Sequence, residues 1–302
     1  MVAWRAVAAR DNADWCDLVG RAHGLAGARD TDAWTVPRRS PPWYPDAVTL
    51  RPGVDAARLL ARIDAGPGAS VKDSFADLDL APHGFRVLFT AEWIHRPPAG
   101  PPATPLVASP LTPPGTPLVA LPGAGPTALA PVTSARGLAA WSAAAGSEAL
   151  HRPALLADPR VTILARRAGD GAVTAGAVLT DCGPAVGVSN VLAADGDLAG
   201  VWRGVVAACP GRPLVGYESG GGLPPAEEAG FRRVGPLRVW LRPDRHRDPD
   251  RHRVTTLRNR RTPARSPVHP PTPPSPPVSP LPLTFGPLLC THRRSISVEL
   301  AE

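Results

Sequence analysis

Proline sets the strongest limit on how this chain can fold, because two of its segments hold too many prolines for regular structure. Residues 97–131 contain twelve prolines, which remove backbone donors and favour extended polyproline conformations. A second Pro-rich run, HPPTPPSPPVSPLPL, lies within residues 244–302, where no apolar periodicity holds. We therefore expect a block at 1–96, a linker or surface excursion at 97–131, a second block at 132–243 and a disordered tail at 244–302.

The formal net charge of +7 belongs mainly to the tail. Residues 244–302 carry ten arginines and five acids, a balance of +5, so the first 243 residues carry only +2. The body therefore gives no strong signal for a polyanionic partner. Two interpretations of the tail stay open. It is a nucleic-acid or membrane-surface arm, disfavoured because no aromatic residues are interleaved among its arginines, or it is a frame-shifted or read-through end of a GC-rich gene.

The spacing of the cysteines and the distribution of apolar residues bear on metal binding and on the cellular compartment. The four cysteines are far apart: Cys16, Cys182, Cys209 and Cys290. This spacing predicts neither a disulfide framework nor a zinc site. Asp11 and Asp14 precede any apolar run long enough for a signal peptide, and the uncharged stretch 97–135 holds too much proline for a membrane helix. We expect a cytoplasmic protein with no metal and no membrane contact, and its oligomeric state stays open.

Helix and strand signals alternate in the second block. Ser134 is suited to cap a helix, and the segment that follows Asp195 and Asp197 has the best helical apolar spacing in the chain, ending at Pro210 and Gly211. The expected elements are a helix at 134–146, a hairpin of strands at 161–167 and 171–181, a strand at 185–193, a helix at 195–211, a strand at 212–219, a short helix at 223–231 and a strand at 232–242. In the first block, residues 11–25 predict an amphipathic helix capped by Asp11 or Asn12.

This order resembles the GNAT family of acyl-CoA N-acyltransferases over residues 132–243. EEAGF followed by RRVGPLRVWLR resembles the closing helix, Gly-Phe pair and strand of that family, and PVTSARGLAAW and VGPLRVWLRP resemble actinobacterial GNAT-like proteins. The resemblance implies an α+β fold, a mixed sheet flanked by helices. Gly230 is then expected in a left-handed C-cap, and Phe231 is expected to fold back into the core.

The loop that binds the cofactor diphosphate in this family departs from the family pattern. The family has an RxxGxG loop between its fourth strand and the next helix, whose amides bind the diphosphate of CoA. Here the place holds LAADGDLAGVW, with Gly196 but without the arginine and the other spaced glycines. By resemblance, the cofactor-binding residues are Ser189, Asn190, Val191, Gly196 and Leu198. Ordinary alternation along a strand is the competing explanation for the polar side chains at 189 and 190.

The expected acid-base residues lie at the end of the strand PLVGYES. A tyrosine that protonates the leaving thiolate in many relatives is replaced by Ala226. Tyr217 and Glu218 are the catalytic candidates, with Glu218 taking a proton from the amine directly or through water if burial raises its pKa. The alternative is that Tyr-Glu-Ser forms a solvent-facing turn.

A weak internal repeat links the two blocks. Residues 70–97 resemble residues 214–243: each has a strand ending in an acid and a serine, a helical piece, Gly-Phe, an apolar strand with tryptophan, and an Arg-Pro stop. Chance similarity between strand-turn-strand pieces is the alternative. A real repeat implies two tandem GNAT-like copies, with residues 1–96 as the degenerate one.

Two functions follow from the resemblance. The first is an acyl-CoA-dependent N-acyltransferase that uses acetyl-CoA or another acyl-CoA as co-substrate and a small-molecule or protein amine as acceptor. Because direct attack by the amine needs mainly positioning and stabilisation of the oxyanion, an incomplete acid-base set does not exclude activity. The second is a non-catalytic GNAT-like binding or scaffold protein, favoured by the missing loop motif and the missing tyrosine.

Overall fold

The structure, a computed structural model, describes residues 3–98, 128–148 and 150–243. Most of the predicted linker at 97–131 and all of the predicted tail at 244–302 lie outside the described residues. The interpretations of the tail as an interaction arm or as a frame-shift product therefore stay predictions.

Helices and strands alternate in both blocks of the described chain. The helices are α1 (Trp4–Ala22), α2 (Ala56–Leu60), α3 (Ala135–Ala144), α4 (Leu198–Ala208) and α5 (Leu223–Glu228). The strands are β1 (Ala28–Arg29), β2 (Ala33–Thr35), β3 (Ala47–Thr49), β4 (Ser70–Asp73), β5 (Arg86–Arg96), β6 (Ala130–Pro131), β7 (Val161–Arg167), β8 (Val173–Asp181), β9 (Val186–Ala193), β10 (Leu214–Glu218) and β11 (Arg232–Leu241). Three short 3-10 turns are η1 (Ala81–His83), η2 (Pro153–Ala157) and η3 (Gly220–Gly222).

All eleven strands form one mixed sheet in the order β1-β2-β3-β4-β11-β5-β10-β9-β8-β7-β6. The pairs β3–β4 and β9–β10 are parallel, and the other neighbours are antiparallel. The order of parallel and antiparallel pairs is therefore the same whether it is read from β1 or from β7. The predicted α+β mixed sheet is confirmed, and its strand directions agree with the predicted repeat.

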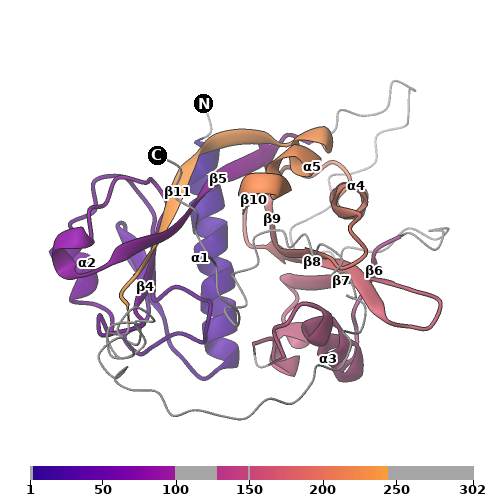
Figure 1. The fold of residues 1–302 in the computed structure, drawn as a ribbon, viewed down its shortest axis with the longest axis horizontal. Coiled ribbons are helices and arrows are strands. Elements are labelled where there is room, and N and C mark those ends of the chain that lie inside the picture. The colour runs from indigo at the N-terminus through magenta and orange to yellow at the C-terminus, as the bar shows by residue number, and fades with distance from the viewer. Residues whose placement is uncertain (1–2, 99–127, 149, 244–302) are drawn as a thin grey trace, which may run out of the picture.

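The two blocks share strands at the centre of the sheet. The first-block strand β5 lies between β10 and β11, and the second-block strand β11 lies between β4 and β5. These strands are the long ones that cross the molecule in Figure 1. The division into 1–96 and 132–243 stays a prediction about domains, but neither stretch closes its part of the sheet alone.

Helices cover both faces of the sheet. Alternate residues of β8 show the two sides: Val178 packs with α1 and α3, whereas Ala177 and Leu179 pack with α4 and α5. In the first block α2 packs with Val71 on the side away from α1. Figure 1 shows α1 at the centre of the molecule, between the strands of the two blocks. This long helix therefore spans both blocks on one face.

The Gly-Phe pair ends α5 as the sequence predicts. Gly230 has φ 93°, and the Phe231 amide donates to the Ala226 carbonyl at 3.1 Å, which is the wide bond of a Schellman cap. Phe231 is buried against Trp202, with ring centroids 4.7 Å apart. The cap lets α5 stop directly against β11 while the phenylalanine enters the core.

Helix α1 begins earlier than predicted. It starts at Trp4, and no side chain of the described residues caps its first turn. Asp11 and Asn12 are therefore interior helix residues, and the predicted cap at this place is wrong. The extra turns are rich in alanine, the strongest helix former, so the helix needs no polar cap to extend toward the N-terminus.

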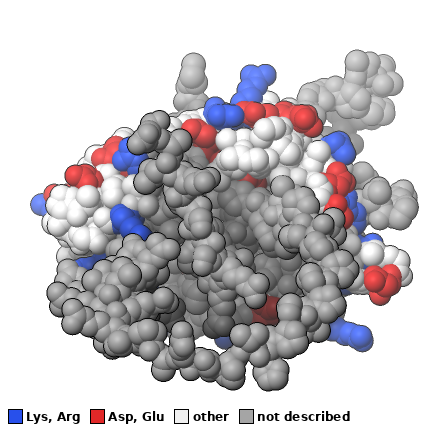
Figure 2. All heavy atoms as spheres, viewed as in Figure 1, with Lys and Arg blue, Asp and Glu red and all other residues white. Residues whose placement is uncertain are grey.

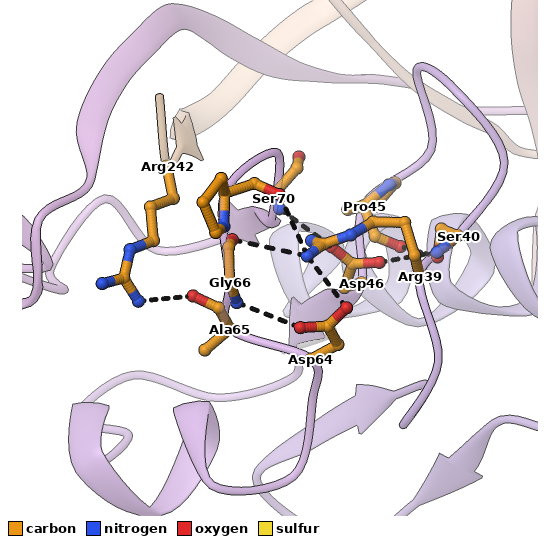
Figure 3. A network of polar contacts seen from close by, with 10 residues as sticks. Arg39, Ser40, Pro45, Asp46, Asp64, Ala65, Gly66, Ser70 and Arg242 are labelled. Atoms are coloured by element: carbon orange, nitrogen blue, oxygen red, sulfur yellow. Dashed lines mark hydrogen bonds and ion pairs between the residues drawn. The ribbon is translucent and has the colours of Figure 1, made fainter. Parts of the chain in front are cut away.

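An arginine-centred network holds the first block to the end of β11 (Figure 3). Arg39 contacts Asp46 at 2.8 Å and Asp64 at 3.2 Å. The buried Asp46 carboxylate also accepts from the amides of Ser40 and Ser70. Arg242, just after β11, donates to the Ala65 carbonyl at 2.6 Å. The buried charge is thus paired and hydrogen-bonded, as burial requires.

Candidate functional site

The sheet opens between the parallel strands β9 and β10. Only three residue pairs join them: Leu214–Val186, Val215–Gly187 and Gly216–Val188. Beyond these pairs, β10 follows β5 to Glu218 and β9 follows β8 to Ala193. The two strand ends therefore part where the sequence places its candidate residues.

A bulge in β9 accompanies the opening. The register against β8 shifts so that Asn190 and Val191 lie between the partners of Val178 and Gly176, and Asn190 has φ 51°. A bulge bends its strand and re-aims side chains. The Asn190 Oδ1 accepts from Trp15 Nε1 of α1 at 3.1 Å, so this side chain turns toward α1.

The other two expected binding residues of β9 differ in surroundings. Ser189 has a buried Oγ with no hydrogen-bond partner among the described residues. Val191 is buried in the core with α4. Ser189 is thus the expected β9 residue with an uncommitted polar atom, whereas Val191 packs as an ordinary core residue.

Glu218 is a buried carboxyl with almost no partners. It is 2% exposed, and its Oε2 has no hydrogen-bond partner in the described structure. Burial raises the pKa of Glu218 to about 8, against a hydrogen bond from the Ser219 backbone that lowers it. A carboxyl held in this range exchanges a proton near neutral pH, which is what a general base or acid needs.

Tyr217 lies on the opposite face of β10, because side chains alternate along a strand. Its ring packs edge-on against Trp93 at 5.6 Å and lies under the Lys72 ammonium, with Nζ 4.3 Å from the ring centroid. Both contacts are on the α1 side. The structure therefore does not bring Tyr217 and Glu218 together as a pair.

Sequence reasoning missed a polar cluster beneath α1. Lys72 of β4 is 5% exposed and donates to Asn12 Oδ1 at 2.8 Å. Its contacts with Tyr217 and Asn12 join three segments that are far apart in the sequence. Cys16 lies one turn from Asn12, and burial raises the pKa of its thiol to about 11. Lys72 is the only lysine of the chain, and this is the sequence feature that could have pointed to the cluster.

A second carboxyl lies close to the same opening. The Asp11 carboxyl contacts Gly187 of β9, and a Cβ at residue 187 would overlap it. Its Oδ1 is buried and has no hydrogen-bond partner within the described part of the chain. Burial raises the pKa of Asp11 well above its ordinary value, and the neighbouring Asp14 and Asp181 add to this. The sequence predicted a helix cap here, so this group was missed as a titratable candidate.

The N-terminus of α4 is closed by carboxylates. Asp197 caps the helix by accepting from the Gly200 amide, and Gly196 has φ 82°. Arg166 of β7 contacts Asp195 at 2.8 Å and Asp197 at 3.0 Å. Leu198, the first residue of α4, packs against the core.

We tested whether these residues fit the diphosphate of an acyl-CoA. A phosphate at a helix N-terminus needs free backbone donors and a positive field. Here the Asp197 side chain accepts a hydrogen bond from the Gly200 amide at 2.8 Å, and the Asp195 side chain accepts one from the Asp197 amide at 3.1 Å. Two carboxylates stand where the phosphates would bind. The diphosphate does not fit, whereas Glu218 on one face of the sheet and Ser189 on the α1 face each keep a polar atom without a partner among the described residues.

No group of three or more His, Cys, Asp or Glu side chains in the described ranges is placed to hold a metal ion. None of the helices in residues 3–98, 128–148 and 150–243 combines the length and the apolarity needed to cross a bilayer. On the face shown in Figure 2, basic and acidic side chains of the described chain are interspersed.

Comparison with known proteins gives structural similarity only. No protein-family model matches the sequence, and no curated protein matches it. The structure is similar to a GCN5-related N-acetyltransferase from Kribbella flavida, with 18% identity, a TM-score of 0.48, and coverage of 80% of this chain and 97% of that one. A GNAT-family protein from Novosphingobium aromaticivorans gives 18% identity, a TM-score of 0.47 and coverage of 77% and 98%. A GCN5-related N-acetyltransferase from Sphaerobacter thermophilus gives 11% identity, a TM-score of 0.39, and coverage of 78% of this chain and 92% of that one.

Proposed function

We propose that the protein transfers an acyl group from a thioester to an amine, with Glu218 as the base that takes the amine proton. The observation that carries the proposal is the Glu218 carboxyl, which is buried, has an Oε2 without a partner among the described residues, and lies at the point where β10 leaves β9. A base at Glu218 lies beside the place where the parallel strands β9 and β10 separate. The acceptor is a small-molecule or protein amine.

The chemistry asks little of the protein beyond position and one proton transfer. The amine nitrogen bonds to the thioester carbonyl carbon, the carbon–sulfur bond breaks, and the thiolate leaves. In its ionised form, whose population grows as the pH approaches 8, Glu218 accepts the proton that the amine loses, and the raised pKa lets it pass that proton on to solvent or to the leaving thiolate. Ser189 pairs with Val178 and therefore lies on the α1 side of the sheet, the face opposite Glu218, so it is given no part in this step.

The test is thiol release from acetyl-CoA with a panel of amines, using the full chain. We expect Glu218→Gln to lower kcat/KM by about 10²-fold or more, the usual contribution of a general base. Glu228→Gln removes an exposed carboxylate from α5 and is the matched control, expected to stay within twofold. Equal activity of the wild-type and Glu218→Gln proteins would remove Glu218 from the mechanism, and no thiol release with any amine would remove acyl transfer.

A second function, a non-catalytic binding or scaffold module, is favoured by the carboxylates at the start of α4. These groups occupy amides that a nucleotide diphosphate would use. Thioester binding measured by calorimetry, without thiol release for any amine, is the result that selects this function over acyl transfer.

A further inference from the structure

The loop before α4 has already used its backbone donors within the protein. The amides of Ala194 and Asp195 donate to the Thr174 carbonyl, and the Gly196 amide donates to the Ala193 carbonyl. The Leu198 amide donates to the Gly196 carbonyl at 3.0 Å. Together with the two amides bound by Asp195 and Asp197, these bonds leave a phosphate few donors without breaking the loop.

Arg166 is also committed. Its side chain is 7% exposed, and its two terminal nitrogens contact Asp195 and Asp197 separately. The pKa of Asp195 is lowered: burial alone would raise it, but the hydrogen bonds from the Asp197 amide and from Arg166 outweigh burial. The Asp195 carboxylate is therefore ionised at neutral pH. Arg203 approaches Asp197 at 3.8 Å, but it is largely exposed and its charge is screened by water.

The interactions that close the loop before α4 depend on one another. A buried guanidinium needs paired carboxylates, and Gly200 is required next to them because a Cβ there would overlap the Asp197 carboxyl. Opening the loop for a diphosphate would separate Arg166 from its partners and bring two negative phosphates to two negative side chains. Such like-charge contacts disfavour binding.

We infer that the acyl donor of this protein is recognised through its thioester arm, of the pantetheine class, and that the α4 N-terminus takes no part of a nucleotide diphosphate. This inference rests on the proposed acyl transfer for the identity of the donor. The second part of the inference, that the diphosphate is not recognised, comes from the closed loop before α4. This loop lacks the contact that would make a thioester with a nucleotide bind more tightly than a thioester without one.

The experiment compares three ligands by calorimetry on the full chain: acetyl-CoA, S-acetylpantetheine and adenosine 3′,5′-bisphosphate. We expect the two thioesters to bind within about threefold of each other and the bisphosphate not to bind at millimolar concentration. Acetyl-CoA binding more than about tenfold tighter, a difference of about 1.4 kcal/mol, with competition by the bisphosphate, would overturn the inference and leave acyl transfer intact.

Failure of acyl transfer gives a different pattern. If neither thioester binds or is turned over, the donor assignment falls together with the proposed function. Thiol release from both thioesters, with the same kcat/KM within threefold, supports both.

A charge-removal variant tests the cause. Asp195→Asn combined with Asp197→Asn keeps the shape of the loop and frees Arg166, so acetyl-CoA affinity should rise by tenfold or more while S-acetylpantetheine affinity stays the same. Asp170→Asn, on the exposed turn between β7 and β8, removes a carboxylate without touching Arg166 and should change neither. If the double variant does not fold, Asp195→Asn alone retains the α4 cap. An unchanged acetyl-CoA affinity in a folded variant would show that the carboxylates are not what closes the loop.

Discussion

At the residue scale, equivalent carboxyls in the two blocks differ in the hydrogen bonds that they accept. Asp73 ends β4 as Glu218 ends β10, and the Asp73 carboxylate accepts from the amides of Phe75, Asp77 and Leu78. Among the residues that the structure describes, Glu218 has only the Ser219 backbone as a hydrogen-bond partner. Burial raises the pKa of Asp73 as well, but its three amide bonds oppose the rise. Most buried carboxyls are hydrogen-bonded in this way, so the missing bonds in the described structure set Glu218 apart as the candidate for proton transfer.

The raised pKa of Glu218 makes stability depend on pH. Between its ordinary pKa of 4.5 and about 8, the unfolded chain ionises this group while the folded protein keeps it protonated, so stability is lost as pH rises through this window. The total is roughly 5 kcal/mol, at 1.36 kcal/mol per pKa unit. We expect Glu218→Gln to be close to wild type in urea unfolding at pH 4.5 and more stable than wild type at pH 8.

Glu228→Gln provides the comparison for this measurement, since it removes an exposed carboxylate. Its difference from wild type should not grow with pH. A Glu218→Gln protein whose stability tracks that of wild type from pH 4.5 to 8 would mean that the carboxyl is not held protonated in the fold.

Lys72 and Asn12 form a buried polar pair that depends on both members. Asn12→Leu leaves the Lys72 ammonium without its acceptor, and we expect a loss of about 1–3 kcal/mol in unfolding free energy. In a Lys72→Met background the same change should cost far less, because no charge is left unpaired. A double-mutant cycle by urea unfolding measures the coupling, and additive effects would contradict a direct interaction.

At the element scale, the Gly-Phe cap explains why a helix can stop directly against a strand. The same geometry ends η1, where Gly84 has φ 81° and Phe85 donates to the Leu80 carbonyl at 3.2 Å and is buried. Both pairs could be predicted from sequence because the signal is local. The start of α1 could not, since alanine-rich segments carry no cap to mark where they begin.

Replacing Gly230 with alanine should destabilise the protein by about 1–2 kcal/mol, the cost of the left-handed region for a residue with a Cβ. The new Cβ would also lie 3.3 Å from Arg96 Nε. Gly221→Ala, at a glycine with open space around it, is the control and should change stability by less than about 0.5 kcal/mol. Thermal or urea unfolding measures both, and equal effects of the two substitutions would argue against the cap.

At the scale of the whole molecule, the site depends on an exchange of strands that no local pattern reveals. The repeat between residues 70–97 and 214–243 was visible in the sequence, but not that β5 and β11 would each lie in the other block's half of the sheet. Lys72 meets Tyr217 for this reason. The sequence could name Tyr217 and Glu218, whereas their partners follow from topology.

A fragment limited to residues 132–243 should not fold alone. Without β5, strands β10 and β11 lose the neighbour that both pair with, and two unpaired edges are exposed. We expect no cooperative unfolding transition by circular dichroism. Co-expression with residues 1–98 should restore a soluble complex on size exclusion. A cooperative transition for 132–243 by itself would show that the second block is an independent domain.

The exchange of strands also imposes an order on synthesis. When β4 and β5 leave the ribosome, β11, the strand that joins them, has not been made, and residues 97–231 must be translated first. Pairings so distant in sequence slow folding, and β5 waits with both edges open, in a state that chaperones recognise and that aggregates readily. Closing the intervening loop becomes only slowly more costly with its length, so a long proline-rich excursion between the blocks is compatible with this order.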